Sequence, residues 1–271
     1  MRSAHSTGGT CNDSCMLDHV SYGAGRDVLF VHGNSLNKEV WTTVVHDAAL
    51  EGYRCIAIDL PGHGGSPRNA ALVPYTLEGM ALELAQFAQG LNEPFLVGHS
   101  LGGHVLMRTL KHLPKASGLV LLGTPPLTAA ADFSAGFLPS PALAKAFNAE
   151  LTEEDARDLA IAYTWAGNDQ HGTVAAMILE ADPRVRQDMG REATSGAWSD
   201  EVAMLRAFKK PVGVMHGSED PFVSLPYLQG IATGLFHGDQ IHVLEGSGHS
   251  PHMQKPLAFA QALADWLGRS V

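Results

Sequence analysis

Short, almost uninterrupted apolar runs recur along the chain and are separated by longer stretches of mixed polarity. A parallel strand with helices on both faces is buried on both sides and is therefore apolar throughout. The pattern thus predicts an α/β protein with a mostly parallel, doubly wound sheet. The predicted strands lie near residues 28–32, 54–59, 95–99, 118–123, 211–216 and 241–245. A hairpin within about residues 3–22 would complete a sheet of about eight strands.

Segments with helical spacing fill most of the intervals between these runs. We expect helices near residues 38–50, 77–90, 101–113, 224–234 and 256–268. In the last of these, apolar side chains recur every three or four positions, and Pro256 suits the first helical position.

Residues 125–208 interrupt this alternation, because they contain no comparable strand run and several alanine-rich stretches. Within them Thr152 is followed by three acidic residues, which is typical of a helix start with negative charge in its first turn. We therefore expect a helical cap inserted after the sixth strand of the sheet. Residues 1–124 and 209–271 would then form the core.

The sequence Gly-His-Ser-Leu-Gly at residues 98–102 follows a predicted strand and opens a predicted helix. In this context it predicts a nucleophile elbow, a sharp turn in which glycines two residues either side of Ser100 relieve crowding. The helix N-terminus would point at Ser100, and the backbone N–H of Leu101 would stabilise an oxyanion. Because Gly-x-Ser-x-Gly also occurs by chance in turns, the hypothesis depends on partner residues downstream.

Two further polar residues follow predicted strands in the chain order that such a site requires, nucleophile, acid and then histidine. Asp220 comes after the run 211–216, and His249 comes after the run 241–245. Because open parallel sheets place their chemistry at the carboxyl ends of the strands, we expect both side chains to meet Ser100 there. His249 would accept the proton of the attacking hydroxyl, and Asp220 would fix the imidazole tautomer.

A second oxyanion donor is expected after an earlier strand, where residues 32–35 are His-Gly-Asn-Ser. We assign this role to the backbone N–H of Asn34, whose side-chain amide could also reach the ligand. The alternative for Asn34 is an ordinary polar turn residue. His252 is the alternative base, but His249 directly follows the glycine-rich residues 246–248 at the end of the strand.

With these motifs the chain resembles the α/β-hydrolase superfamily from about residue 27 onward. Residues 59–66, Asp-Leu-Pro-Gly-His-Gly-Gly-Ser, are similar to the loop after the fourth strand in this superfamily. The resemblance implies an α/β-hydrolase fold. Since that loop is usually structural, we expect His63 to brace it through hydrogen bonds and not to act in catalysis.

Several segments also resemble the α/β-hydrolase type of N-acyl-homoserine lactonase, which opens the lactone ring of bacterial quorum signals. They are residues 32–35, 123–126 with 136–137, 151–155 and 220–223. This resemblance implies a quorum-quenching serine lactonase. The chain differs from that group in two positions. It has His99 before the nucleophile, where that group has an aromatic residue, and its acid is of a different residue type.

The serine itself separates some classes of the superfamily. Dehalogenases and epoxide hydrolases need a carboxylate at this position, so both are disfavoured. A general carboxylesterase, a carbon–carbon bond hydrolase, a cofactor-free perhydrolase and an iminopeptidase share these residues and stay open as alternatives. Outside enzymes, the alternative is a lactone receptor built on the same scaffold.

Aromatic residues in and near the cap suggest an apolar roof over Ser100. The residues assigned to substrate contact are Asn34, His99, Tyr163, Trp165 and Phe222. The same role is open for Phe133, Phe137, Phe147 and Met177. For the cap aromatics the alternative is packing within the cap, where rings at helical spacing bury area. We expect a small-molecule ester or lactone with an apolar group as the substrate.

Composition narrows the partners and the location. A formal charge of −10 without clustered Lys and Arg disfavours nucleic acid and anionic membranes. The first twenty residues hold no continuous apolar segment, so neither a signal peptide nor a membrane anchor is expected, and we expect a cytoplasmic protein. We expect a monomer or a homodimer.

No metal or other cofactor is expected. The fourteen histidines are dispersed, and the His-x-His-x-Asp-His arrangement of metal-dependent lactonases is missing from the sequence. Cys55 lies in an apolar run, and Cys11 and Cys15 would suit a metal only if other ligands converged on them. His104 and His112, which follow Ser100 in the same predicted helix, are expected at the surface or in packing.

Overall fold

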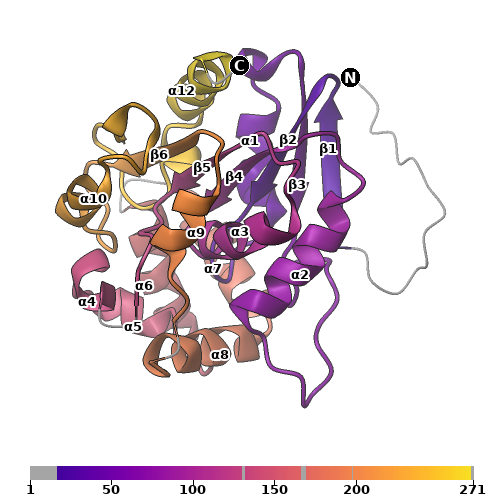
Figure 1. Ribbon diagram of the computed structural model, residues 1–271. Helices are drawn as coiled ribbons and strands as arrows, with labels where there is room; N and C mark the ends of the chain where they lie inside the picture. Colours follow the sequence, from indigo (N-terminus) through magenta and orange to yellow (C-terminus); the bar gives the residue numbers. More distant parts are fainter. Residues whose placement is uncertain (1–16, 130–131, 166–168, 197, 270–271) are drawn as a thin grey trace.

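The computed structural model describes residues 17–129, 132–165, 169–196 and 198–269, and these contain a seven-stranded sheet with helices on both faces (Figure 1). The strand order is β1-β3-β2-β4-β5-β6-β7, in which β1 runs antiparallel to β3 and every other pair is parallel. The strands are β1 (His19–Gly23), β2 (Arg26–Val31), β3 (Tyr53–Ile58), β4 (Phe95–His99), β5 (Gly118–Leu122), β6 (Val212–Gly217) and β7 (His242–Leu244). The predicted class, an α/β-hydrolase fold with a mostly parallel sheet, is confirmed.

Two details of the predicted sheet need correction. About eight strands were expected, whereas the described residues form seven, because only β1 of the expected N-terminal hairpin falls among them. The rest of that hairpin lies in residues 1–16, outside the described part of the chain, as do Cys11 and Cys15. For the same reason the helical insertion follows the fifth described strand, β5, where the sixth was expected.

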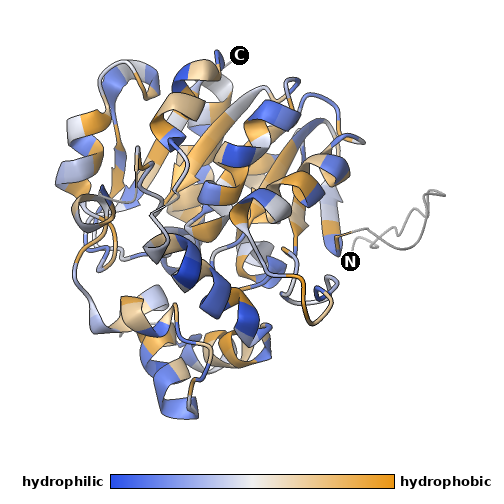
Figure 2. Cartoon of the chain, turned by 60° about the horizontal axis from the view of Figure 1, so that its bottom comes forward, coloured by the Kyte–Doolittle hydropathy of each residue, from blue (hydrophilic) through white to orange (hydrophobic). Residues whose placement is uncertain are grey.

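Burial follows the position of each strand in the sheet. Every residue of the central strands β4 and β5 is buried, as expected for strands covered on both faces. The edge strand β1 instead alternates exposed and half-buried residues. Figure 2 shows apolar residues concentrated on the strands and polar residues on the outer faces of the helices. The most deeply buried strands are therefore in the middle of the sheet, and one of them, β4, ends at His99, directly before Ser100.

The helices outside the insertion cover the two faces of the sheet. They are α1 (Thr42–Val45), α2 (Leu77–Ala88), α3 (Leu101–Thr109), α10 (Leu225–Ile231), α11 (Pro251–Gln254) and α12 (Pro256–Arg269). Helices α2 and α3 pack against each other in front of the sheet in Figure 1, and α1 packs against α12. None of the helices in the described part of the chain has the length and apolar character needed to cross a bilayer.

The single helix predicted over residues 38–50 is wrong. The structure has three short pieces there, the 3-10 helix Lys38–Trp41, α1 and the 3-10 helix Ala48–Leu50. The break has a local cause, because the side chain of Asp47 accepts a hydrogen bond from the backbone N–H of Ala49, 2.8 Å away. Aspartate forms such bonds in competition with the helix ladder and starts a new turn.

Residues 125–208, called the cap segment below, supply the helices between β5 and β6. They are α4 (Phe133–Gly136), α5 (Pro141–Lys145), α6 (Glu153–Thr164), α7 (His171–Glu180), α8 (Pro183–Thr194) and α9 (Glu201–Ala207). The predicted helix start at Thr152 is confirmed, because Thr152 and Asp155 exchange side-chain to backbone hydrogen bonds of 3.1 Å each. Buried apolar residues of α6 and α8 join the same hydrophobic core as the sheet.

Candidate active site

Ser100 occupies a strained turn between β4 and α3. Its φ and ψ angles are 51° and −117°, a region that non-glycine residues rarely adopt. The turn closes only because its neighbours have no side chain. A Cβ on Gly98 would lie 2.7 Å from the Cα of Gly103, and one on Gly102 would lie 2.5 Å from the carbonyl oxygen of Val31. The elbow predicted for residues 98–102 is therefore present in the backbone geometry.

The turn is also held from the neighbouring strand. The hydroxyl of Thr124, just beyond β5, donates to the carbonyl oxygens of Ser100 and Leu122, each at 3.0 Å. The backbone N–H of Ser100 donates to the same carbonyl of Leu122 at 2.9 Å. These bonds fix the serine at the carboxyl end of the sheet, where open parallel sheets bind their ligands.

His249 and Asp220 form a buried pair at the same edge of the sheet. Nδ1 of His249 lies 2.9 Å from Oδ2 and 3.1 Å from Oδ1 of Asp220. Oδ1 also accepts the backbone N–H groups of Phe222 and Val223 at 2.8 and 3.1 Å. Because Nδ1–H donates to the carboxylate, Nε2 of His249 carries the free lone pair of the neutral ring.

Two opposing effects act on the Asp220 carboxyl. Burial alone would raise its pKa, since the charged form loses water. Interaction with His249, together with His216 and the backbone N–H of Phe222, outweighs burial and holds the pKa of Asp220 below its ordinary value. The carboxylate is therefore ionised at neutral pH.

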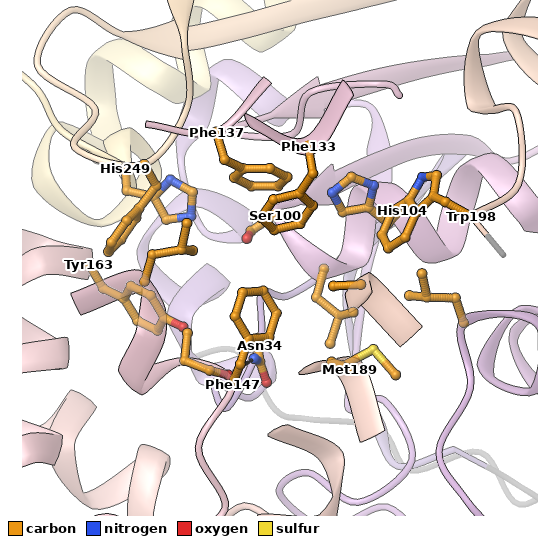
Figure 3. A pocket seen from close by; sticks show the side chains of 16 residues that line it. Asn34, Ser100, His104, Phe133, Phe137, Phe147, Tyr163, Met189, Trp198 and His249 are labelled. Carbon is orange, nitrogen blue, oxygen red and sulfur yellow. Dashed lines mark hydrogen bonds between the residues drawn. The ribbon is translucent and has the colours of Figure 1, made fainter. Parts of the chain in front are cut away.

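Ser100 and His249 line one cavity beneath the cap segment, and Figure 3 shows both side chains at its wall. No hydrogen bond joins the hydroxyl of Ser100 to the ring of His249 within the described residues. Such bonds are often long in ligand-free sites and shorten when the substrate binds. The walls are mainly apolar, and their largest side chains include Phe133, Phe137, Phe147, Leu143, Met189 and Trp198.

The two predicted oxyanion donors belong to residues that line the same cavity as Ser100. Leu101 and Asn34 both line the cavity, and Leu101 is the first residue of α3, so its N–H has no partner inside the helix. The side-chain amide of Asn34 is engaged elsewhere, because Nδ2 donates to the carbonyl of Ala146 at 2.7 Å and Oδ1 accepts from Ser35 at 3.2 Å. The loop after β2 is thus tied to the end of α5.

The residues predicted to contact the substrate separate into two groups. Tyr163 and Phe222 line the cavity, and the ring of Phe222 stands at 89° to that of His249 with centroids 4.8 Å apart. His99 is not among the lining residues; it lies buried with Nε2 3.0 Å from the carbonyl oxygen of His249. Trp165 follows the last residue of α6, has 39% of its surface exposed and does not line the cavity either.

Other expectations concern side chains near the site. Of the four residues left open, Phe133, Phe137 and Phe147 line the cavity, whereas Met177 packs against the core. His252 is buried, stacks on Trp41 with centroids 4.2 Å apart and does not line the cavity. His63 braces its loop, since its Nε2 accepts the backbone N–H of Ser35 at 3.1 Å.

His104 is the cavity residue that the sequence analysis missed. It was expected at the surface or in packing; it is 6% exposed and packs against Trp198, and it also lines the cavity. Its spacing of four from Ser100 carried the signal, because residues i and i+4 share one helix face. Trp198 and Glu201, its partners from the cap segment, had no recognisable sequence pattern. In the described part of the chain no three His, Cys, Asp or Glu side chains converge as a metal site would require.

Comparison with known proteins agrees with the fold. Residues 28–262 match the Alpha/beta hydrolase family, and the chain belongs to that family. Among curated relatives, it is 28% identical over 252 residues to a pimeloyl-[acyl-carrier protein] methyl ester esterase of Sodalis glossinidius (strain morsitans), covering 89% of this chain and 93% of the relative. It is 27% identical over 251 residues to the non-heme chloroperoxidase CPO-A1 of Kitasatospora aureofaciens, covering 89% and 90%.

A solved structure of the N-acyl homoserine lactonase AidH, complexed with N-butanoyl homoserine, is also similar. It superposes with a TM-score of 0.84 at 26% sequence identity and covers 94% of both chains. The relatives of this chain thus include esterases, a lactonase and haloperoxidases. Within this family the chain is similar to enzymes that act on small ester or lactone substrates.

Proposed function

We propose that this protein is a serine hydrolase that cleaves a carboxylic ester or lactone through an acyl-enzyme, most specifically the lactone of an N-acyl homoserine lactone. One observation carries the proposal. A serine held in a strained strand-to-helix turn shares an apolar cavity with a histidine whose other ring nitrogen is bonded to a buried carboxylate. Resemblance to AidH at 26% identity supports the lactone as the substrate.

In the proposed mechanism Ser100 attacks the carbonyl carbon while Nε2 of His249 accepts the hydroxyl proton. Asp220 stabilises the imidazolium that forms and keeps Nδ1 protonated. The backbone N–H groups of Leu101 and Asn34 stabilise the negative charge on the carbonyl oxygen. His249 then returns the proton to the leaving alcohol, which in a lactone stays attached to the acyl group. Water then attacks the acyl-enzyme while Nε2 of His249 accepts its proton, and His249 returns this proton to the oxygen of Ser100 as the carboxylic acid is released.

The cap segment would select the substrate. Its aromatic and aliphatic side chains form most of the cavity wall, so an acyl chain can leave water there. We propose residues 125–208 as a cap on the core formed by residues 1–124 and 209–271. Tyr163 and Phe222 are the proposed contacts beside His249.

A linear carboxylic ester is the second candidate, because the chain is 28% identical to a methyl ester esterase across nearly its whole length. Both substrates need the same three residues and differ only in whether the leaving alcohol departs. Multiple turnovers would separate either enzyme from a lactone receptor, which would stop after one cycle.

A pH-stat assay tests the proposal with N-acyl homoserine lactones of different acyl length and with linear esters of matched carbon number. We expect many turnovers on the lactones and loss of activity in Ser100→Ala. Turnover of the linear esters alone would reject the lactone assignment. Activity that survives in Ser100→Ala would reject the serine mechanism.

A further inference from the structure

A second histidine–carboxylate pair borders the cavity on the side away from His249. Nδ1 of His104, on α3, lies 2.9 Å from Oε1 of Glu201, the first residue of α9. Both side chains are buried, with 6% and 0% of their residue surface exposed. Figure 3 shows His104 and His249 on opposite sides of Ser100. The proposed mechanism uses only His249.

Glu201 is already neutralised by a neighbour other than His104. Its carboxylate accepts hydrogen bonds from Nη1 of Arg108 and, at 3.0 Å, from the backbone N–H of Leu127. Burial would raise the pKa of Glu201, but the contacts with His104, Arg108 and Leu127 outweigh it and lower the pKa. The guanidinium of Arg108 is itself buried and lies 4.9 Å from the ring centroid of Trp198. Glu201 and Arg108 therefore form a buried ion pair, and Nδ1 of His104 is bonded to the carboxylate of that pair.

The position of the proton on His104 follows from this arrangement. A carboxylate accepts only, so Nδ1 of His104 must be the N–H donor. In the neutral ring Nε2 then carries a lone pair and accepts hydrogen bonds. Among the described residues no hydrogen bond engages Nε2, and this atom is not one of the fully buried polar atoms without a partner. Nε2 is thus accessible from the cavity that the ring lines.

The ring is also held in a defined orientation. Trp198 packs edge-on against it at 88° with centroids 5.4 Å apart, and Phe137 lies against it at 6.1 Å. His104 lies one helical turn from the nucleophile, and its backbone N–H bonds the carbonyl of Ser100 at 3.3 Å. A hydrogen-bond acceptor with a defined orientation therefore belongs to the wall of the cavity that Ser100 also lines.

We propose that His104 is a specificity-determining residue whose Nε2 accepts a hydrogen bond from an N–H group close to the scissile carbonyl of the substrate. The acylamino group of an N-acyl amino lactone supplies such an N–H and carries an apolar chain for the aromatic wall. This inference rests on the proposed function and extends it, because it assigns the discrimination between acylamino lactones and lactones without the N–H to one side chain.

The test compares two lactones that differ in one group. One is N-hexanoyl homoserine lactone, and the other is its carba analogue, in which CH₂ replaces the amide N–H. The variant His104→Asn retains an N–H donor for Glu201 at the position of Nδ1 but has no atom at the position of Nε2. His112→Asn, the same exchange farther along the chain beside Glu78, is the matched control.

We expect wild type to have a higher kcat/KM for the amide lactone than for the carba analogue. His104→Asn should lower the ratio of these two kcat/KM values about tenfold, the usual effect of one hydrogen bond. The loss would fall on the amide substrate, while the carba analogue and the control variant stay within about twofold of wild type. Equal losses on both lactones would show a structural role and overturn the proposal. An unchanged ratio would overturn it as well.

A binding experiment separates this inference from the proposed function. Calorimetry on Ser100→Ala, with and without His104→Asn, measures the affinity of both lactones without turnover. We expect the preference for the amide only where His104 is present. If wild type opens neither lactone but this preference is found, the proposed reaction is wrong and the recognition role stands. The recognition role would be overturned if each variant bound the two lactones with equal affinity, or if neither lactone bound.

Discussion

The geometry at Ser100 depends on single residues at which two backbone segments lie very close together. The turn at Ser100 places a non-glycine residue at positive φ, which costs about 1–3 kcal/mol and persists only where the surroundings enforce it. Gly102 is part of that enforcement, because the start of α3 lies directly against the end of β2. The close packing of α3 against β2 thus causes both the strain in the Ser100 backbone and the position of its hydroxyl at the cavity.

Gly102→Ala tests this dependence. The new Cβ would lie 2.5 and 2.6 Å from the carbonyl oxygens of Val31 and His32, so α3 must move and carry the N–H of Leu101 with it. We expect the free energy of unfolding to fall by about 1–3 kcal/mol, as for other overpacked sites, and esterase activity to fall with it. Gly172→Ala in α7, where nothing lies within 4 Å, is the control and should be neutral or stabilising. The free energy of unfolding is measured in urea. Equal values for Gly102→Ala and Gly172→Ala would contradict the claim that the backbone is crowded at Gly102.

Asp220→Asn tests the tautomer argument. The asparagine oxygen can still accept the N–H groups of Phe222 and Val223, so the loop should keep its shape. Its amide would face Nδ1 of His249 and favour the wrong tautomer, and we expect kcat to fall about 10⁴-fold with little change in KM. The adjacent, exposed Glu219 gives the matched control, Glu219→Gln, which should retain wild-type kinetics. A large loss in the control and a small one in Asp220→Asn would reassign the acid.

The sequence predicted which residues would be found at the strand ends but not how each side chain would be used. Ser100, Asp220 and His249 follow apolar runs that the sheet brings together, so their positions could be inferred. The spacing of four from Ser100 could place His104 on the helix face of the nucleophile. Its contacts could not be inferred, because Glu201 and Trp198 lie in the cap segment, whose path no periodic pattern predicts. Trp165 was assigned to the cavity on residue type alone, and the direction of its side chain depends on the end of α6.

At the scale of elements, α6 depends on its start at Thr152. The capping box there satisfies N–H groups that would otherwise lack partners, and the same helix carries Tyr163 to the cavity. We expect Thr152→Ala to lower the free energy of unfolding by about 1 kcal/mol, whereas Thr152→Ser should keep most of it. Urea midpoints measure both changes. Equal midpoints for the alanine variant and wild type would show that the capping box at Thr152 contributes nothing to stability.

The elements themselves were predictable to different degrees. The six apolar runs agree with β2 to β7 within two residues at each end. The signal is strongest for β4 and β5, whose residues are all buried. The segment 38–50 has helical spacing but breaks at Asp47, where a side-chain hydrogen bond outcompetes the helix. The short helices α4, α5 and α9 of the cap segment are too brief for a periodic pattern to define their limits.

The whole molecule buries many neutral histidines, and this sets its response to acid. Burial lowers the pKa of His32 to about 4 and that of His63 and His252 to about 3, and it also lowers the pKa of His99 and His216. In the unfolded chain each ring titrates near the ordinary value of about 6.5. Between about pH 6.5 and 4 the unfolded state therefore binds more protons, and stability must fall as the pH falls.

We expect each such histidine to cost about 1.4 kcal/mol per pH unit in this window. Urea midpoints from pH 7.5 to 4.5 measure the slope. His252→Phe should flatten this slope by roughly one histidine, because the ring stacks on Trp41, lies edge-on to Phe259 and makes no hydrogen bond in the described structure. Stability that stays level through this range would contradict the burial of these rings in neutral form.

Covalent labelling of the nucleophile tests the central claim most directly. The protein is treated with an alkyl fluorophosphonate, its intact mass is measured and the modified peptide is mapped. The account predicts one adduct per chain, located on Ser100, no adduct in Ser100→Ala and much slower labelling in His249→Ala. Stoichiometric labelling at another residue, or undiminished lactone and ester hydrolysis by Ser100→Ala, would contradict it.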